Sequence, residues 1–274
     1  MPITLQDIRV YPVKGLSGQP LDRADLAVGA VLPDDRRFAI AHGASRFDPA
    51  EPGWQKKSQF LQLCHTERLA QLDSNYDVET GVLTLSRDGR RVAGGDIRTQ
   101  LGRDLVNQFL AAFLSRDEAR GAPKLVEAPG VSFTDAPEPW LSIINLASVR
   151  DLAERILRRP VDPLRFRGNL MIDGGEPWAE LGWEGRRIAI GGAVLEGMER
   201  IGRCAATNVD PGSGERDLNI PRTLLKSYGH TDCGLYVRVV QGGPIAAGDE
   251  VTVEEIPGAG RPGDRQDLDA TGPF

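Results

Sequence analysis

The stretch RIAIGGAVLEGME, residues 187–199, sets short apolar runs on both sides of a glycine pair, which is typical of β-structure. Gly, Pro and Asp separate it from similar short runs elsewhere in the chain. Those runs cover residues 7–14, 37–42, 81–87, 90–94, 234–241 and 249–255. The pattern predicts a mainly β protein built from sheets or barrels.

Two stretches have a helical period instead. In residues 99–115 one predicted face carries Leu101, Leu105, Val106, Phe109, Leu110 and Phe113. Residues 145–157 repeat the pattern, and Asn145 is placed to cap the first turn. The polar segment 115–123 predicts a domain boundary, which gives domains 1–122 and 123–256. The remaining residues, 257–274, contain little to bury and predict a flexible tail.

Composition limits the possible partners and the cellular compartment. The chain has 274 residues and a formal net charge of −6, which argues against a nucleic-acid surface. No apolar run reaches the roughly 18 residues of a membrane span, so no membrane partner is expected. The three cysteines form no CxxC pair, which favours a reducing compartment. We therefore expect a cytoplasmic protein.

Cys204, in RIGRCAATNVDP (200–211), is the most ambiguous residue of the sequence. Free cysteine is often buried and inert, so simple packing is the first alternative. The neighbouring Arg200 and Arg203 would instead favour the thiolate, which attacks electrophiles or binds a soft metal. No His or Cys lies at metal-ligand spacing from it, so an all-protein zinc site is not expected.

Several cationic side chains could bind an anion. Lys14 follows a predicted strand in a glycine-rich turn, which could also be an ordinary hairpin. Because successive side chains of a strand point to opposite faces, Arg36 and its neighbour Arg37 should lie on opposite faces of the predicted strand. In an extended segment, Arg165, Arg167 and Asn169 would share one face and could clamp a phosphate or a heteroaromatic edge; a solvated strand face is the alternative.

Taken together, six motifs resemble one known family. They are YPVKGLSG (11–18), DDRRFAI (34–40), APEPWLSIINLASVRDL (136–152), LRFRGNLMID (164–173), RCAATNVDP (203–211) and GGPIAAGDEV (242–251). In this order they resemble proteins of the MOSC family, named for the molybdenum cofactor sulfurase carboxyl-terminal domain. The most similar branch is that of the mitochondrial amidoxime reducing component and the bacterial YcbX proteins. The resemblance implies an amino-terminal β-barrel domain followed by a MOSC barrel of the pyruvate-kinase-like type.

The resemblance also implies a cofactor and its ligands. Cys204 is similar to the cysteine that ligates molybdenum carried by molybdopterin, and Thr207 and Asp210 match positions beside the metal. By the same resemblance, Lys14 and Arg36 would hold the cofactor's phosphate. Ser142 and Asn145 would line the cofactor, and its pterin would be clamped by Arg165, Arg167 and Asn169.

The implied activity is reduction of N-oxygenated or N-hydroxylated compounds by oxygen-atom transfer at the Cys204-ligated molybdenum. Asp210 or His230 could supply a proton. Neither pyridoxal phosphate nor an iron–sulfur cluster is expected in this chain, so electrons would come from a separate ferredoxin- or flavoprotein-type donor. Gly229 and His230 depart from the family's arginine after LKSY, which would alter the mouth of the pocket. The alternative hypothesis is a non-catalytic carrier that holds the cofactor or sulfane sulfur on Cys204.

Overall fold

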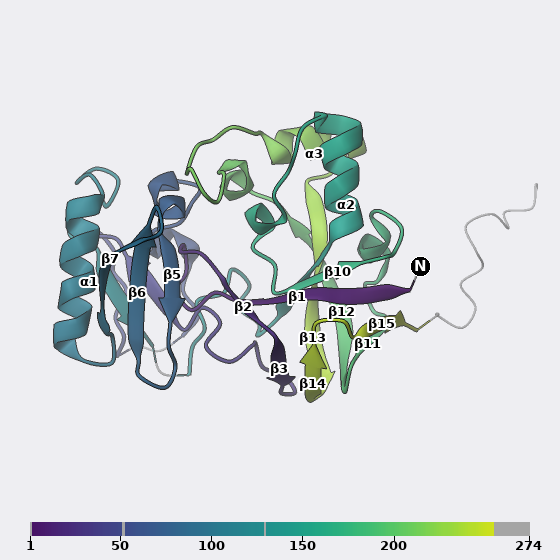
Figure 1. The fold of residues 1–274 in the computed structure, drawn as a ribbon, viewed down its shortest axis with the longest axis horizontal. Helices are drawn as coiled ribbons and strands as arrows, with labels where there is room; N and C mark the ends of the chain where they lie inside the picture. Colours follow the sequence, from purple (N-terminus) through teal and green to yellow (C-terminus); the bar gives the residue numbers. More distant parts are fainter. Residues whose placement is uncertain (1, 51–52, 129, 255–274) are drawn as a thin grey trace, which may run out of the picture.

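A computed structural model describes residues 2–50, 53–128 and 130–254 and shows two parts side by side (Figure 1). The described residues hold fifteen strands and three α-helices, which confirms the mainly β prediction. The predicted tail, residues 257–274, lies outside the described residues.

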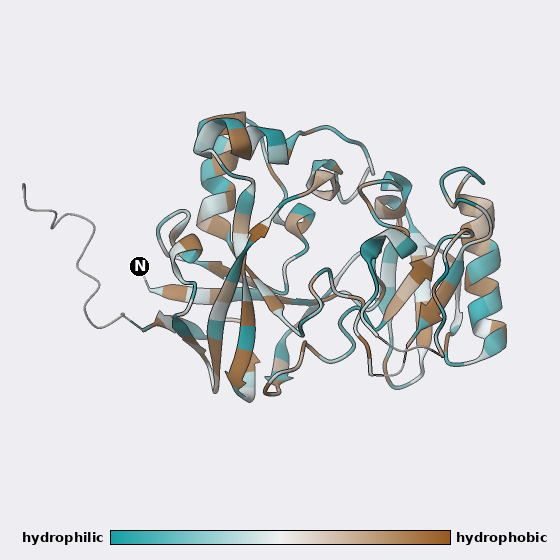
Figure 2. Ribbon diagram, turned by 180° about the vertical axis from the view of Figure 1, so that it is seen from behind, coloured by the Kyte–Doolittle hydropathy of each residue, from teal (hydrophilic) through white to brown (hydrophobic). Residues whose placement is uncertain are grey.

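The larger part is a closed barrel of seven strands. Its order around the ring is β1 (Ile3–Val10), β10 (Leu170–Asp173), β9 (Leu141–Asn145), β13 (Asp232–Gln241), β12 (Ala193–Gly202), β11 (Arg187–Ile190) and β15 (Glu250–Val253), which pairs with β1 again. All neighbours are antiparallel except β9 and β10. Figure 2 shows hydrophobic and hydrophilic residues alternating along the barrel strands, as expected when one face of each strand lines a core.

The stretch 187–199 forms the β11–β12 hairpin of this barrel. Ile190 pairs with Ala193 across a two-residue turn, Gly191-Gly192. Gly191 has φ +53°, and a Cβ atom there would lie 2.3 Å from Asp249 Oδ2. Such tight hairpin turns need positive φ, which glycine adopts without steric cost.

The first strand of the chain belongs to this carboxyl-terminal barrel. β1 pairs with β10 on one side and with β15 on the other, and β2 (Gln19–Leu21) extends it. Further along, β3 (Arg23–Leu26) pairs with β14 (Gly243–Ala246). The division of the chain near residue 122 stays a prediction, and these pairings place β1, β2 and β3 with the barrel.

The smaller part contains β5 (Asp73–Tyr76), β6 (Val82–Arg87) and β7 (Arg90–Asp96) as one antiparallel sheet. A second sheet pairs β4 (Phe38–Ala41) with β8 (Lys124–Glu127), and the short helices η1 (Lys57–Gln59) and η2 (Glu67–Gln71) lie in the chain between β4 and β5. The expected amino-terminal barrel thus takes the form of two small sheets over a common apolar core, because the chain between β4 and β5 forms turns instead of strands.

Helix α1 (Gln100–Phe113) confirms the predicted helix, but only part of the predicted face is buried. Gly102, Val106 and Leu110 are buried, whereas Leu101 and Leu105 are 71% and 47% exposed. The reason is close packing at Gly102, where a Cβ atom would lie 2.0 Å from the Asp96 carbonyl oxygen. The helix therefore turns its glycine toward β7 and its first two leucines outward.

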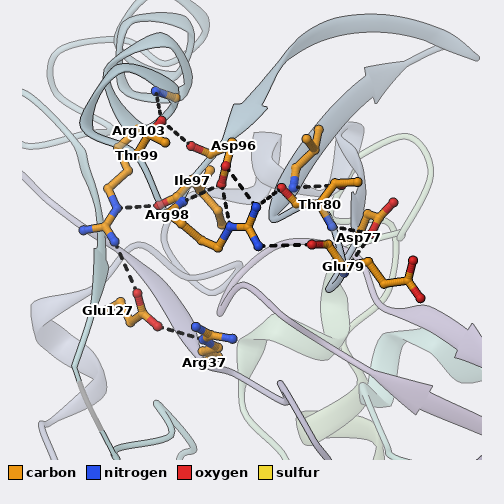
Figure 3. A network of polar contacts seen from close by, with 12 residues as sticks. Arg37, Asp77, Glu79, Thr80, Asp96, Ile97, Arg98, Thr99, Arg103 and Glu127 are labelled. Atoms are coloured by element: carbon orange, nitrogen blue, oxygen red, sulfur yellow. Dashed lines mark hydrogen bonds and ion pairs between the residues drawn. The ribbon is translucent and has the colours of Figure 1, made fainter.

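An ionic network near α1 holds Arg37 (Figure 3). Arg37 Nε donates to Glu127 Oε1 at 2.7 Å, and Arg103 Nη2 donates to Glu127 Oε2 at 3.3 Å. Arg98 pairs with Asp96 beside it. Glu127 thus binds Arg37 within the smaller part, and the adjacent Arg36 points toward the barrel, where it reaches the Arg167 carbonyl.

Helices α2 and α3 lie over one end of the barrel (Figure 1), and the remaining short helices come from the same half of the chain. In chain order the helices of this half are α2 (Leu146–Asp151), the π-helical turn η3 (Leu152–Leu157), η4 (Pro163–Phe166), η5 (Ala179–Gly182), η6 (Ala205–Asn208) and α3 (Ile220–Tyr228). Asn145 caps α2 as predicted, because its side chain accepts from the Ala147 amide.

Candidate active site

A cleft between the two parts collects most of the predicted site residues. It measures about 990 Å³ including its open mouth. Eight predicted residues line it: Lys14, Arg36, Ser142, Arg165, Arg167, Asn169, Cys204 and Thr207. Asn145 and Asp210 are not among its lining residues.

Cys204 is exposed in this cleft, directly after β12 and before η6. Thr207 fixes the local backbone, since its Oγ1 donates to the Cys204 carbonyl at 2.9 Å. Cys233 is fully buried, and burial raises the pKa of its thiol to about 12. Cys64 is half-buried, and burial raises the pKa of its thiol as well, with Cys204 adding to the effect. Of the three thiols, that of Cys204 is the best placed to meet a ligand.

Two arginines of the cleft have no acidic partner among the described residues. Arg167 donates from Nη1 to the Leu16 carbonyl at 2.7 Å. Arg203 donates to the carbonyl oxygens of Cys233 and Phe166. Burial lowers the pKa of both guanidiniums, because the protein interior disfavours an uncompensated charge. Their positive charge is therefore available to an anionic ligand. Arg200, by contrast, pairs with Glu184 at 3.3 Å and does not line the cleft.

Arg36 and Arg167 stack against the same aromatic ring. Their guanidinium carbons lie 4.8 and 4.5 Å from the centre of the Tyr11 ring. Arg36 also pairs with Asp35 and donates to the Arg167 carbonyl at 3.1 Å. Tyr11 thus positions one cation from each side of the interface between the two parts.

Lys14 enters the cleft from the turn that follows β1. Its Nζ donates to the Phe133 carbonyl at 2.8 Å and pairs with Asp135. Burial lowers the pKa of the ammonium, and Asp135 offsets part of that effect. Lys57 lies 3.8 Å from the other Asp135 oxygen and brings a second cation to the cleft mouth.

The segment 163–169 is not extended as predicted. It forms the turn η4, capped by Asp162 with Pro163 at its start, and Arg167 follows with φ +52°. Proline fixes a φ suited to such a turn, which overrides the expected strand. Even so, Arg165, Arg167 and Asn169 all reach the cleft.

The Arg165 guanidinium forms ion pairs with two acidic side chains. Its Nη2 contacts Asp210 Oδ2 at 2.9 Å and Asp217 Oδ1 at 2.8 Å, and its Nη1 donates to the Asn208 carbonyl. Asp210 also accepts from the amides of Gly212 and Ser213. Burial would raise the pKa of this carboxyl, but those bonds and Arg165 lower it. A catalytic role for Asp210 stays a prediction, and its partners favour a role in positioning Arg165.

Ser142 and Asn169 bind each other, whereas Asn145 lies in a separate network. Asn169 Oδ1 accepts from the Ser142 hydroxyl at 3.0 Å, and its amide donates to the Arg9 carbonyl. Asn145 donates to the buried Glu180 carboxylate at 2.9 Å. Asn145 therefore links α2 to η5, and it is not among the residues that line the cleft.

Sequence interpretation did not identify the aromatic wall of the cleft. Trp140 and Tyr236 line it with ring centres 5.7 Å apart, and Asp135 and Lys57, the first residue of η1, line it as well. The position of Trp140 within the motif 136–152 was the one feature of the sequence that could have identified this wall. His230, considered as a proton donor, pairs loosely with Asp232 and does not line the cleft.

The Asp135 carboxyl predicts an acid-side pH dependence. Burial would raise its pKa, but Lys14 outweighs burial and lowers it to about 2. The unfolded value is near 3.9, so as the pH falls from about 4 to 2 the unfolded chain binds the proton first and stability is lost. The side chain is 49% exposed, which limits the effect to below about 1 kcal/mol. Thermal unfolding of Asp135→Asn should decline less steeply over this range than wild type. Asp88→Asn, on an exposed turn, is the control, and equal slopes for wild type and Asp135→Asn would contradict the assignment.

The protein is mainly β, with a closed barrel as its larger part. The exposed thiol of Cys204, in a cleft lined by cations between the two parts, makes that cleft a candidate cofactor site. The sequence model of the MOSC domain family matches residues 131–252, so this part of the chain is a MOSC domain. The family resemblance seen in the motifs is thereby confirmed.

Individual relatives are similar over parts of their length. Human mitochondrial amidoxime-reducing component 1 is 34% identical over 102 residues, covering 37% of this chain and 29% of that protein. Molybdenum cofactor sulfurase of rice (Oryza sativa subsp. japonica) is 34% identical over 269 residues, covering 82% of this chain and 31% of that protein. The chain thus spans less than a third of either relative.

Among solved structures, the YuaD protein of Bacillus subtilis is 12% identical with a TM-score of 0.43, and the match covers 92% of this chain and 96% of that one. In the part of the chain that the structure describes, no helix has the length and apolar character needed to cross a membrane.

Proposed function

We propose that this protein binds the molybdenum cofactor in the cleft through Cys204 and reduces N-oxygenated or N-hydroxylated small molecules by oxygen-atom transfer. One observation carries the proposal: an exposed thiol shares the cleft with cationic groups that lack acidic partners among the described residues. The names of the relatives, which refer to amidoxime reduction and to the molybdenum cofactor, support it.

The residues present fit this cofactor. Within residues 2–50, 53–128 and 130–254, no three His, Cys, Asp or Glu side chains are grouped to hold a metal ion. A single thiolate binds a soft metal firmly only when further ligands come from elsewhere. A metal carried on an organic dithiolene meets that need, and its phosphate requires the kind of cations that Lys14 and Arg36 provide.

Each cleft residue then has a defined task. When bound, the cofactor would supply two-electron oxygen-atom-transfer chemistry. Cys204 Sγ would be the protein ligand of the metal, and Lys14 Nζ with the Arg36 guanidinium would bind the phosphate. Arg167 and Arg203 would offer N–H donors on the pterin side. Ser142 and Asn169, which are hydrogen-bonded to each other, would line the same cleft.

The aromatic wall would receive the substrate. Trp140 and Tyr236 offer flat surfaces for an aromatic or amidine-like group. Burial raises the pKa of the Tyr236 phenol, so its hydroxyl keeps its proton at neutral pH and can donate it to a substrate oxygen. A separate electron-donor protein would deliver the electrons, and we place the reaction in the cytoplasm.

The proposal is tested by measuring molybdenum and pterin per chain after expression in a host that makes the cofactor. Near-stoichiometric metal and pterin in wild type, with the metal lost in Cys204→Ala, is the expected result. Cys64→Ala, which changes a neighbouring thiol that does not line the cleft, is the matched control and should keep the metal. A folded wild-type protein with neither metal nor pterin would refute the proposal.

The exposure of Cys204 also favours the second candidate, a carrier of sulfane sulfur or of the cofactor in transit. In that case mass spectrometry would find an added sulfur on Cys204, or stoichiometric cofactor without turnover. The arginines without acidic partners favour the enzyme over a sulfur carrier, because a persulfide needs no pterin clamp.

A further inference from the structure

A second cavity lies directly behind the candidate active-site cleft. Both spaces are lined by Gly15, Leu63, Arg165 and Arg167, so these four residues form the wall between them. The cavity measures about 890 Å³ including its mouth. Its exposed lining residues, Pro20, Asp73 and Asn75, place the mouth beside β2 and β5.

Two residues that line this cavity have buried hydrogen-bond donors without partners among the described residues. Tyr11 lines the second cavity but not the cleft, and it is 2% exposed. Its hydroxyl has no hydrogen-bond partner among the described atoms, and neither does Arg165 Nε. Burying such a group without a partner costs about 1–3 kcal/mol. These groups therefore point to a ligand that accepts hydrogen bonds.

One cation of the wall, Arg167, could hold an anion. Arg9 pairs with Asp7 and Arg165 pairs with two aspartates, so neither of these guanidiniums is free, and Asp73 adds a carboxylate at the mouth. Arg167 has one recorded side-chain hydrogen bond, to a carbonyl, and no ion pair in the described part of the chain. One uncompensated guanidinium beside a phenol hydroxyl suits the planar, two-oxygen carboxylate, which accepts hydrogen bonds from both.

The rest of the wall is mixed, with apolar side chains beside the polar Ser17, Gln19 and Ser74. Leu16, Leu63, Ala70, Leu164 and Val209 line the cavity, with Pro20 and Pro211 nearer the surface. The apolar side chains bind the body of a ligand by excluding water from it. The occupant should therefore carry an apolar group next to its anionic end.

We propose that the second cavity binds a small carboxylic acid with an aromatic or aliphatic body. The carboxylate accepts from the Tyr11 hydroxyl and the Arg167 guanidinium, and the body packs against Leu16, Ala70 and Val209. Because Arg167 lines both spaces, an occupant here also changes the charge that faces the cleft. The proposal does not depend on which cofactor the cleft holds.

The test is calorimetric titration of the full-length chain with benzoate. Saturable binding at one site is expected, and Tyr11→Phe, which removes only the hydroxyl, should weaken it about tenfold or more. Tyr76→Phe is the matched control: its hydroxyl is also buried without a recorded partner, but Tyr76 lines neither cavity, so benzoate affinity should not change. Ala70→Leu, which fills the cavity, should abolish binding, with thermal unfolding used to confirm that the variant folds.

Three results would overturn the proposal. The first is the absence of saturable binding at millimolar benzoate. The second is an affinity that Tyr11→Phe leaves unchanged, which would place benzoate in the cleft or on the surface. The third is equal weakening by Tyr11→Phe and Tyr76→Phe, which would reflect a general loss of packing. A wild-type chain without molybdenum that still binds benzoate through Tyr11 would refute the proposed function and leave this site supported.

Discussion

Replacement of Cys204 by alanine is expected to reduce the turnover of an aromatic amidoxime by more than about a hundredfold, with reduced viologen as electron donor. The physical reason is that Cys204 is the sole metal ligand the proposed site takes from this chain. Changes to residues that merely support a metal ligand already cost about 10- to 100-fold in affinity or activity, so loss of the ligand itself should cost more. The measurement is the rate of amidine formation per chain by chromatography.

The two other cysteines test whether this loss is specific. Cys64→Ala should keep turnover within a few-fold of wild type, because Cys64 is not among the residues that line the cleft. Cys233→Ala leaves a small cavity in the core and should lower stability more than turnover. Turnover by Cys204→Ala at the wild-type rate would exclude thiolate ligation, even if the protein binds the cofactor.

Much of the candidate site could be predicted because its residues lie in short ordered motifs. Lys14, Arg36, Arg167 and Cys204 come from four such motifs, and all line one cleft. Their partners could not be predicted in the same way, because the partners come from distant parts of the chain. Asp217, which occupies Arg165 together with Asp210, lies outside every quoted motif.

It was harder to predict from sequence whether a polar residue stabilises the backbone or binds a ligand. Asn145 was predicted both to cap a helix and to line the cofactor, and the structure shows the cap together with a bond to the buried Glu180. Nothing local in the sequence reveals that bond, because Glu180 is 35 residues away. Trp140 and Tyr236 meet for the same reason, through the pairing of β9 with β13.

Alternation identified several strands, whereas β9 and β10, which are buried on both faces, were not predicted. The hairpin of residues 187–199 has polar or small residues at alternate positions and was identified directly. β9, LSIIN, is buried at every position, and β10, LMID, at three of its four. A continuous apolar run of this length is compatible with a strand or a buried helical turn, so periodicity alone does not decide between them.

The second large effect is expected in the barrel, where Leu5→Ala should lower the free energy of unfolding by about 2–5 kcal/mol. Leu5 lies in β1, is fully buried in the barrel core and pairs with Ile172 of β10. Its backbone also joins the carboxyl-terminal end of the ring, since its amide donates to the Asp249 carbonyl at 2.8 Å. A cavity at this position therefore weakens the contacts of the strand that closes the barrel.

Denaturant unfolding followed by tryptophan fluorescence measures this change, because Trp183 packs in the same core. Gln6→Ala is the matched control: its side chain is exposed on the same strand, so the change should stay within about 0.5 kcal/mol. If Leu5→Ala were as mild as Gln6→Ala, β1 would not complete the barrel. A loss confined to Leu5→Ala would show that a strand from the amino terminus stabilises a domain that family comparison traces only from residue 131.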